Sequence, residues 1–178
     1  MLNNGNILSS REVSLQEILE TDCRYLYEKW DSQRGNDFAP SWRSFELLDL
    51  PTHVIPFCRV VDVLRDPFDL VYRFWGTGLV KVLGADRSGK SLLQLDVSRV
   101  AEATKEYQTV IERQAPFYYV YDAKTSKGLY FNPVFAPAIR LPLTDDGETV
   151  DKIISYVDFN TDSDVWQKVF EEESQPTD

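Results

Sequence analysis

The chain has 178 residues, 43% of them hydrophobic, which suffices for one well-buried core, and we expect a single folded domain. Its 29 acidic residues outnumber 19 basic ones and give a formal net charge of -10. We expect no nucleic-acid partner, because phosphate-backbone binding depends on clustered Lys and Arg. No apolar stretch approaches the roughly 20 residues that span a bilayer. The start MLNNGNILSS lacks an export-signal pattern, so we expect a cytoplasmic protein with no membrane partner.

The first predicted helix covers residues 14–34. Ser14 followed by Glu17 is a capping box, and the apolar side chains after it recur at helical spacing. This apolar stripe consists of Leu15, Ile18, Leu19, Cys23, Leu26 and Trp30. The stripe packs either on the chain's own core or on a second copy, so a homodimer through helix 14–34 is an open alternative. A second, shorter helix is expected over residues 41–48.

The middle of the chain has the composition of β-strands, rich in β-branched and aromatic residues. The predicted strands are 57–64, 69–76, 117–123, 129–141 and 150–159. The pair Asp66-Pro67 between the first two strands is typical of a turn, so these strands are predicted to form a hairpin. One long helix is expected between residues 98 and 114, and a short helix with an acidic tail over 161–178. Hairpins with few helices favour an α+β fold with an antiparallel sheet.

Residues 84–91, GADRSGKS, match the phosphate-loop pattern G-x-x-x-x-G-K-[ST]. That pattern binds phosphate only between a buried strand and a helix of a parallel sheet. Here Gly76-Thr77 predicts a helix before the loop, and SLLQLD after Ser91 is too short for the phosphate-binding helix. Nucleotide hydrolysis is therefore the less favoured alternative.

The stretch YRFWGTGLVKVLGADRSGKSLLQL, residues 72–95, resembles the front half of a PAS domain. A wider set of residues resembles a family of small bacterial proteins in which one PAS domain makes up nearly the whole chain. This set is Trp42, Leu50-Pro51, Ile55-Pro56, Tyr72-Arg73, Gly76-Thr77, Gly84, Asp86, Gly89-Lys90 and Pro142-Leu143.

The resemblance implies a five-stranded antiparallel sheet of order 2-1-5-4-3 with helices on one face. The PAS domain would cover residues 36–160, after an N-terminal tail and flanking helix (1–35) and before a C-terminal helix and acidic tail (161–178). It also implies that Gly84 ends one short helix, that Gly89 turns the chain into the next, and that Lys90 is solvated.

PAS domains commonly hold a small molecule between sheet and helices, but the histidine and cysteine positions do not support two familiar cofactors. A haem PAS ligates iron through a histidine on the long helix, whereas the single histidine, His53, precedes the first strand. The stretch around Cys23 is similar to the flavin-reactive segment of blue-light sensors, but it also lies before the first strand. Cys23 and Cys58 instead suit apolar positions, and no zinc site is expected. The cofactor stays unknown.

Aromatic side chains alternate along the predicted strands, which places several of them on one face of the sheet. A buried tyrosine needs a partner for its hydroxyl, and a small polar ligand can be that partner. We hypothesise a small-molecule cavity whose ligand-binding residues are Trp75, Tyr107, Tyr119, Tyr121 and Phe131, with Arg73 at its rim. Arg73 must reach solvent or find a carboxylate. A filled aromatic core is the open alternative.

No catalytic constellation is found in the sequence, because His53 has no evident serine or carboxylate partner. The expected function is therefore not enzymatic. The chain is expected to be a stand-alone PAS sensory module in signal transduction, which binds an unknown small molecule and signals through an unknown partner protein. The alternatives are a ligand-free interaction or dimerisation module and, less favoured, a nucleotide hydrolase.

Overall fold

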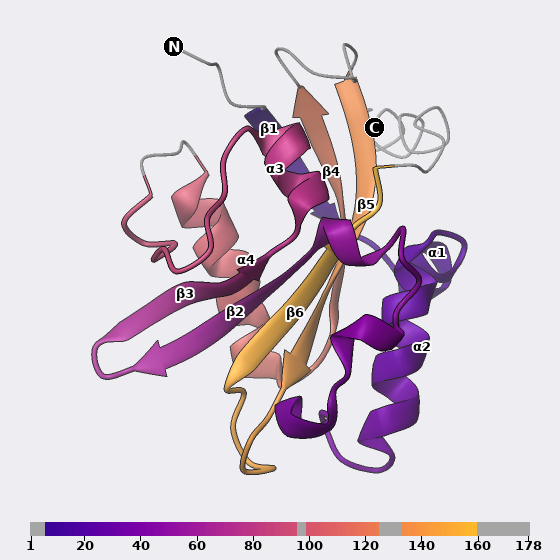
Figure 1. Cartoon of the computed structure of the whole chain (residues 1–178), viewed down its shortest axis with the longest axis vertical. Coiled ribbons are helices and arrows are strands. Elements are labelled where there is room, and N and C mark those ends of the chain that lie inside the picture. The colour runs from indigo at the N-terminus through magenta and orange to yellow at the C-terminus, as the bar shows by residue number, and fades with distance from the viewer. Residues whose placement is uncertain (1–5, 96–98, 125–132, 160–178) are drawn as a thin grey trace, which may run out of the picture.

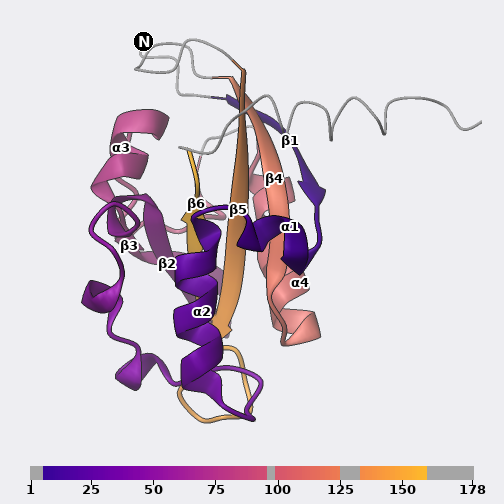
Figure 2. The ribbon, with the colours of Figure 1, turned by 90° about the vertical axis from the view of Figure 1, so that its right-hand side faces the viewer.

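One antiparallel sheet with helices against both of its faces organises the chain (Figures 1 and 2). The computed structural model describes residues 6–95, 99–124 and 133–159. Its strands are β1 (Asn6–Glu12), β2 (Cys58–Arg65), β3 (Phe68–Trp75), β4 (Phe117–Lys124), β5 (Pro133–Leu143) and β6 (Lys152–Val157). Its α-helices are α1 (Leu15–Leu19), α2 (Cys23–Arg34), α3 (Thr77–Leu83) and α4 (Val100–Arg113). The predicted C-terminal helix over 161–178 lies outside the described residues.

The strand order is β1-β4-β5-β6-β2-β3, and every neighbouring pair is antiparallel. The α+β class with an antiparallel sheet is therefore confirmed. The expected count of five strands is wrong, because β1 adds a sixth strand next to β4, with Ser10 opposite Tyr121. The sequence NILSSRE has no clear alternation of apolar and polar residues, so only the pairing with β4 defines this strand.

The helices cover both faces of the sheet, whereas the sequence analysis placed helices on one face and assigned no face to the flanking helix 14–34. Helices α3 and α4 cover one face, here called the inner face, where their side chains pack on Tyr72, Trp75 and Tyr119. Helices α1 and α2 cover the opposite, outer face and pack on Val60, Ile139 and Ile154. Figure 2 shows α2 and α4 on opposite sides of β4 and β5. Helices on both faces explain why β6 and residues 135–143 of β5 are buried at every position.

The predicted helix 14–34 is two helices joined at residues 20–22. The capping box at its start is present, since the Ser14 side chain accepts from the Glu17 amide while the Glu17 carboxylate accepts from the Ser14 amide. The apolar stripe packs on the chain's own sheet, where Trp30 donates a 2.6 Å hydrogen bond from its Nε1 to the Pro142 carbonyl. Residues 41–48 form two 3-10 turns, η1 (Trp42–Ser44) and η2 (Leu47–Asp49), in place of the expected helix.

Three glycines shape the segment that leads from β3 toward α4. Gly76 lies at the start of α3, where an added Cβ would come within 2.2 Å of the Pro56 carbonyl oxygen, so only glycine fits. Gly84 ends α3 in the left-handed region, with φ 79°, the role that the resemblance implies for it. Gly89, with φ 75°, does not turn the chain into another helix. It turns the chain back along β3, and Ser91 forms a bridge to Val71.

Candidate functional site

A small cavity of about 60 Å³ lies between the inner face of the sheet and helices α3 and α4. Its lining comes from β2, β3, β4 and β5 on the sheet side, and from α3, α4 and the segment between them on the other. The lining residues are Arg59, Tyr72, Trp75, Leu83, Arg87, Leu92, Arg99, Ala103, Tyr121 and Arg140. Four of these ten residues are arginines, an unusual content for an interior surface.

The cavity brings together part of the predicted site. Trp75 and Tyr121 line it directly. Tyr119 lies beside Tyr121, with 3.3 Å between their hydroxyl oxygens, and the Tyr107 ring centroid is 3.8 Å from the Arg140 guanidinium carbon. Phe131 lies outside the described residues. Apart from Arg73, the predicted residues that the structure describes therefore gather on the inner face.

Arg73 does not lie at this cavity. The register of β2 and β3 shifts at Arg73, because Val60 pairs with Phe74 whereas Val61 pairs with Tyr72. In a regular strand Arg73 would share a face with Trp75. The bulge places Tyr72 beside Trp75 instead, with ring centroids 4.8 Å apart. Arg73 is about half exposed and pairs with Asp62 on β2 at 2.8 Å, the carboxylate partner that the sequence led us to expect.

Two arginines are buried at the inner wall of the cavity, Arg59 at 4% exposed and Arg140 at 1%. Arg59 donates from Nη2 to the hydroxyls of Tyr121, at 3.2 Å, and Tyr119, at 3.4 Å. Arg140 donates to Ser155 Oγ at 3.3 Å and to the Tyr121 hydroxyl at 3.1 Å. The Nε of both arginines has no hydrogen-bond partner among the described residues. Such unsatisfied buried donors are costly, and they are the features that a bound acceptor would relieve.

Glu106 on α4 is the one carboxylate that contacts this arginine cluster in the described part of the chain. It accepts hydrogen bonds from Arg140 at 2.5 Å, Arg99 at 3.1 Å and Ser10 of β1 at 2.8 Å. Burial works to raise the pKa of Glu106, but the attraction of Arg140 and Arg99 outweighs it and lowers the pKa. The carboxylate is therefore ionised at neutral pH and holds two guanidinium groups.

The positive charges of the cluster exceed the negative ones. Arg59 and Arg140 are buried and Arg99 is partly exposed, and only Glu106 opposes these three within the described residues. Burying an ion costs several kcal/mol after relaxation, whereas a guanidinium over an aromatic ring recovers about 0.5–2 kcal/mol. The rings near Arg59 and Arg140 therefore offset only part of this cost. The interior keeps an uncompensated attraction for negative charge.

The sequence analysis missed all four cavity arginines and Glu106. The signal was present, because Arg59 and Arg140 stand among apolar residues in predicted strands, as Arg73 does. What could not be seen is which strand arginines face inward. Residues Ala136 and Ala138 lie opposite Tyr121 and Tyr119 in the sheet, and their small side chains leave the space that the guanidinium groups fill.

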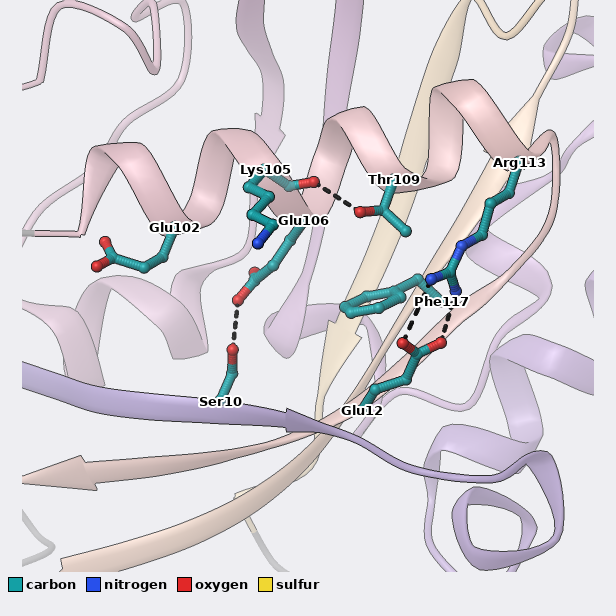
Figure 3. Close-up of a pocket in the computed structure, with 8 residues that line it drawn as sticks. All are labelled: Ser10, Glu12, Glu102, Lys105, Glu106, Thr109, Arg113 and Phe117. Atoms are coloured by element: carbon teal, nitrogen blue, oxygen red, sulfur yellow. Dashed lines mark hydrogen bonds and ion pairs between the residues drawn. The ribbon is translucent and has the colours of Figure 1, made fainter.

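A larger groove of about 400 Å³ lies between β1 and α4 (Figure 3). It is lined by Ser10, Glu12, Glu102, Lys105, Glu106, Thr109, Arg113 and Phe117. Figure 3 shows β1 and α4 joined across it by two contacts, Ser10 with Glu106 and Glu12 with Arg113 at 2.6 Å. Acidic and basic side chains alternate here, so the groove lacks the charge surplus of the interior cavity.

The cysteines and the histidine lie away from the cavity. Cys23 and Cys58 are fully buried on the outer-face side, and burial raises the pKa of both thiols, which disfavours the reactive thiolate. His53 is half exposed and lies 3.2 Å from Asp22 and edge-on to Tyr25. The sequence analysis found no carboxylate partner for His53, and the structure corrects this. The described residues contain no cluster of three potential metal ligands.

Four backbone amides of the segment 84–91, which matches the phosphate-loop pattern, already donate hydrogen bonds within the chain, and the first is that of Gly84. Gly89 N–H donates to the Tyr72 carbonyl at 2.7 Å, and Lys90 N–H donates to the Arg87 carbonyl at 3.0 Å. Ser88 N–H donates to the Asp86 carboxylate at 2.9 Å. A phosphate-binding loop instead points free amides at its ligand from the start of a helix. Here α3 precedes the loop, and residues 91–95 after it contain no helix.

No described helix has an apolar stretch long enough to cross a membrane. Comparisons of the chain with protein-family models, with curated proteins and with solved structures gave no match.

Proposed function

We propose that the protein is a PAS-like sensory module that binds a small molecule in the interior cavity and signals through a partner protein. The observation that carries this proposal is the cavity itself, between the inner face and α4, with unsatisfied Nε groups of Arg59 and Arg140 in its lining residues. A ligand that accepts these hydrogen bonds would offset the cost of burying the donors.

The arrangement of the sheet supports the PAS resemblance. Without β1, the neighbouring strands read β3-β2-β6-β5-β4, which is the order that the resemblance implies for its five strands. Along the chain, the long helix α4 comes after β3 and directly before β4, as in the pattern that the resemblance implies. The additional strand β1 and the helices on the outer face are features beyond that pattern.

The alternative to a ligand-binding protein is a ligand-free interaction module. A core without any cavity would favour this alternative. The cavity volume of about 60 Å³ exceeds the ~10–15 Å³ that one water molecule needs, so the inner face is not fully filled. The apolar face of α2 packs on the chain's own sheet, which is the first of the two roles that the sequence left open for helix 14–34.

Filling the cavity tests ligand binding. Ala103→Met on α4 is expected to remove the stabilisation that a ligand gives, because the longer side chain occupies the cavity that Ala103 lines. At about 100 times its Kd a ligand adds about 2.7 kcal/mol, which raises the Tm by several degrees for a chain of this size. The measurement is a thermal-shift screen of neutral, cationic and anionic metabolites, combined with native mass spectrometry of freshly purified protein.

Ala101→Met is the matched control, because Ala101 is exposed on the same helix and does not line the cavity. It should respond to ligands as the wild type does. Binding in the interior cavity would be refuted if no compound stabilised the wild type, or if Ala103→Met responded as strongly as the control.

Lys90→Ala tests the nucleotide alternative. Lys90 is exposed and the loop amides beside it are engaged, so we expect no micromolar binding of ATP or GTP with magnesium to either form. The substitution should change the free energy of unfolding by less than about 0.5 kcal/mol. Calorimetric titration with both nucleotides checks this, and nucleotide binding that Lys90→Ala abolishes would restore the hydrolase reading.

A further inference from the structure

Two arginines of the interior cavity have no ion pair with any described residue. These are Arg59, on the inner wall, and Arg87, in the segment between α3 and α4. Arg99 and Arg140 share the single carboxylate of Glu106. The chain as a whole is strongly acidic, with a formal charge of -10, so this concentration of positive charge is local to the cavity. Local surplus charge in a water-poor interior selects ligands of opposite sign.

Arg59 and Arg87 lie near the same aromatic ring. Their guanidinium carbons are 5.8 Å and 5.1 Å from the centroid of Trp75. Arg59 is buried, whereas Arg87 and Arg99 are partly exposed, so the cavity has a buried arginine at its inner end and partly exposed ones at its outer end. Unused donors also lie in the lining residues, namely Nε of Arg59, Nε of Arg140 and Nε1 of Trp75. This arrangement suits a ligand that brings several acceptor atoms and a negative charge.

The volume limits the size of the buried group. About 60 Å³ is room for a few water-sized groups, since one water molecule needs ~10–15 Å³ of such space. A carboxylate with one or two carbon atoms behind it fits this space, whereas a nucleotide or a haem does not. The planar guanidinium matches a carboxylate edge through paired N–H donors. Leu83 and Leu92 offer apolar contacts for the attached carbon atoms.

We propose that the cavity binds a small aliphatic carboxylate, or the carboxylate end of a slightly longer one, between Arg59 at the inner wall and Arg87 at the outer end. This inference rests on the proposed function, since it names the ligand class of the same cavity. The carboxylate supplies the negative charge that the arginine cluster lacks and accepts from its unused donors.

The test compares carboxylates with their neutral isosteres on the full chain. Acetate and propionate are titrated against acetamide and propionamide at constant ionic strength, with inorganic phosphate as a third arm. Binding is followed by thermal shift and by calorimetric titration. We expect the carboxylates to raise the Tm and the amides to leave it unchanged.

Three variants assign the effect to residues. Arg87→Gln is expected to weaken propionate binding roughly tenfold or more, the equivalent of one charge-assisted hydrogen bond. Arg59→Met is expected to abolish binding without lowering the Tm of the ligand-free protein, because an apolar side chain of similar length removes an unpaired buried charge. Arg73→Gln is the matched control, since Arg73 pairs with Asp62 outside the cavity, and it should bind propionate as the wild type does.

The outcomes separate this inference from the proposed function. Equal stabilisation by amides and carboxylates, or binding of phosphate alone, would overturn the carboxylate assignment while ligand binding in the cavity stands. Unchanged propionate affinity in Arg87→Gln would also overturn it, even if Arg59→Met failed to fold. If no probe bound and the metabolite screen found no ligand that Ala103→Met excludes, the proposed function would fail as well.

Discussion

Glu106→Gln is expected to lower the free energy of unfolding by about 3–5 kcal/mol at pH 7, because removing one partner of a buried ion pair leaves the other charge uncompensated. Here two guanidinium groups lose their carboxylate, and Arg140 among them is 1% exposed. Urea denaturation followed by circular dichroism measures the change. Glu102→Gln on the exposed side of α4 is the control and should stay within about 0.5 kcal/mol of the wild type.

The pH dependence of this difference identifies the charge as its cause. Because the folded pKa of Glu106 is lowered below its ordinary value of 4.5, the carboxylate contributes stability that is fully present above that value. This contribution is lost as the pH falls through the folded pKa. The difference between wild type and Glu106→Gln should therefore be constant near neutral pH and shrink under acidic conditions. A difference that does not depend on pH would mean that shape, not charge, matters at this position.

The same substitution bears on the carboxylate proposal. Glu106→Gln raises the surplus of positive charge near the cavity, because Arg99 and Arg140 no longer share a carboxylate. Propionate should therefore bind this variant more tightly than it binds the wild type, although the variant is less stable. Opposite signs for stability and affinity would distinguish a charge-selective cavity from a loosened core.

Trp30→Ala is expected to lower the free energy of unfolding by about 3–5 kcal/mol, the usual cost of deleting a buried aromatic side chain. Trp30 is 2% exposed, packs on the outer face and donates its indole N–H to the Pro142 carbonyl. The substitution therefore removes packing and leaves a buried carbonyl without its donor. Glu28→Ala, on the exposed side of the same helix, is the control with an effect of about 0.5 kcal/mol or less.

The concentration dependence of unfolding decides between the two roles of this helix. When the apolar stripe packs on the chain's own sheet, the Trp30→Ala loss is the same at every protein concentration. If helix 14–34 formed a homodimer, the wild-type midpoint would rise with concentration, and the substitution would remove that rise. Denaturation at protein concentrations about a hundredfold apart measures this.

Local sequence patterns determined the elements whose signals lie within a few residues. The capping box at Ser14 and Glu17, the hairpin around Asp66-Pro67, and the long helix α4 all follow from short-range hydrogen bonding or from apolar spacing, and the structure has them. The antiparallel α+β class follows from those elements as well. The aromatic alternation at Tyr119 and Tyr121 correctly placed these side chains on one face of the sheet.

Only the tertiary structure decided which side chains form the cavity. The bulge at Arg73 places Tyr72 on the inner face of the sheet, where a regular strand would place Arg73. No local sequence pattern predicts this bulge. Strand β1 is defined by its pairing with β4. This pairing places Ser10 against Glu106, although the two residues are 96 positions apart in the sequence. Arg59 and Arg140 come from different strands, and Glu106 from α4, so their charge balance is set by contacts between elements distant in sequence. The sequence shows the charge and the secondary-structure propensity of each residue, but whether buried charges are balanced depends on which residues the fold brings together.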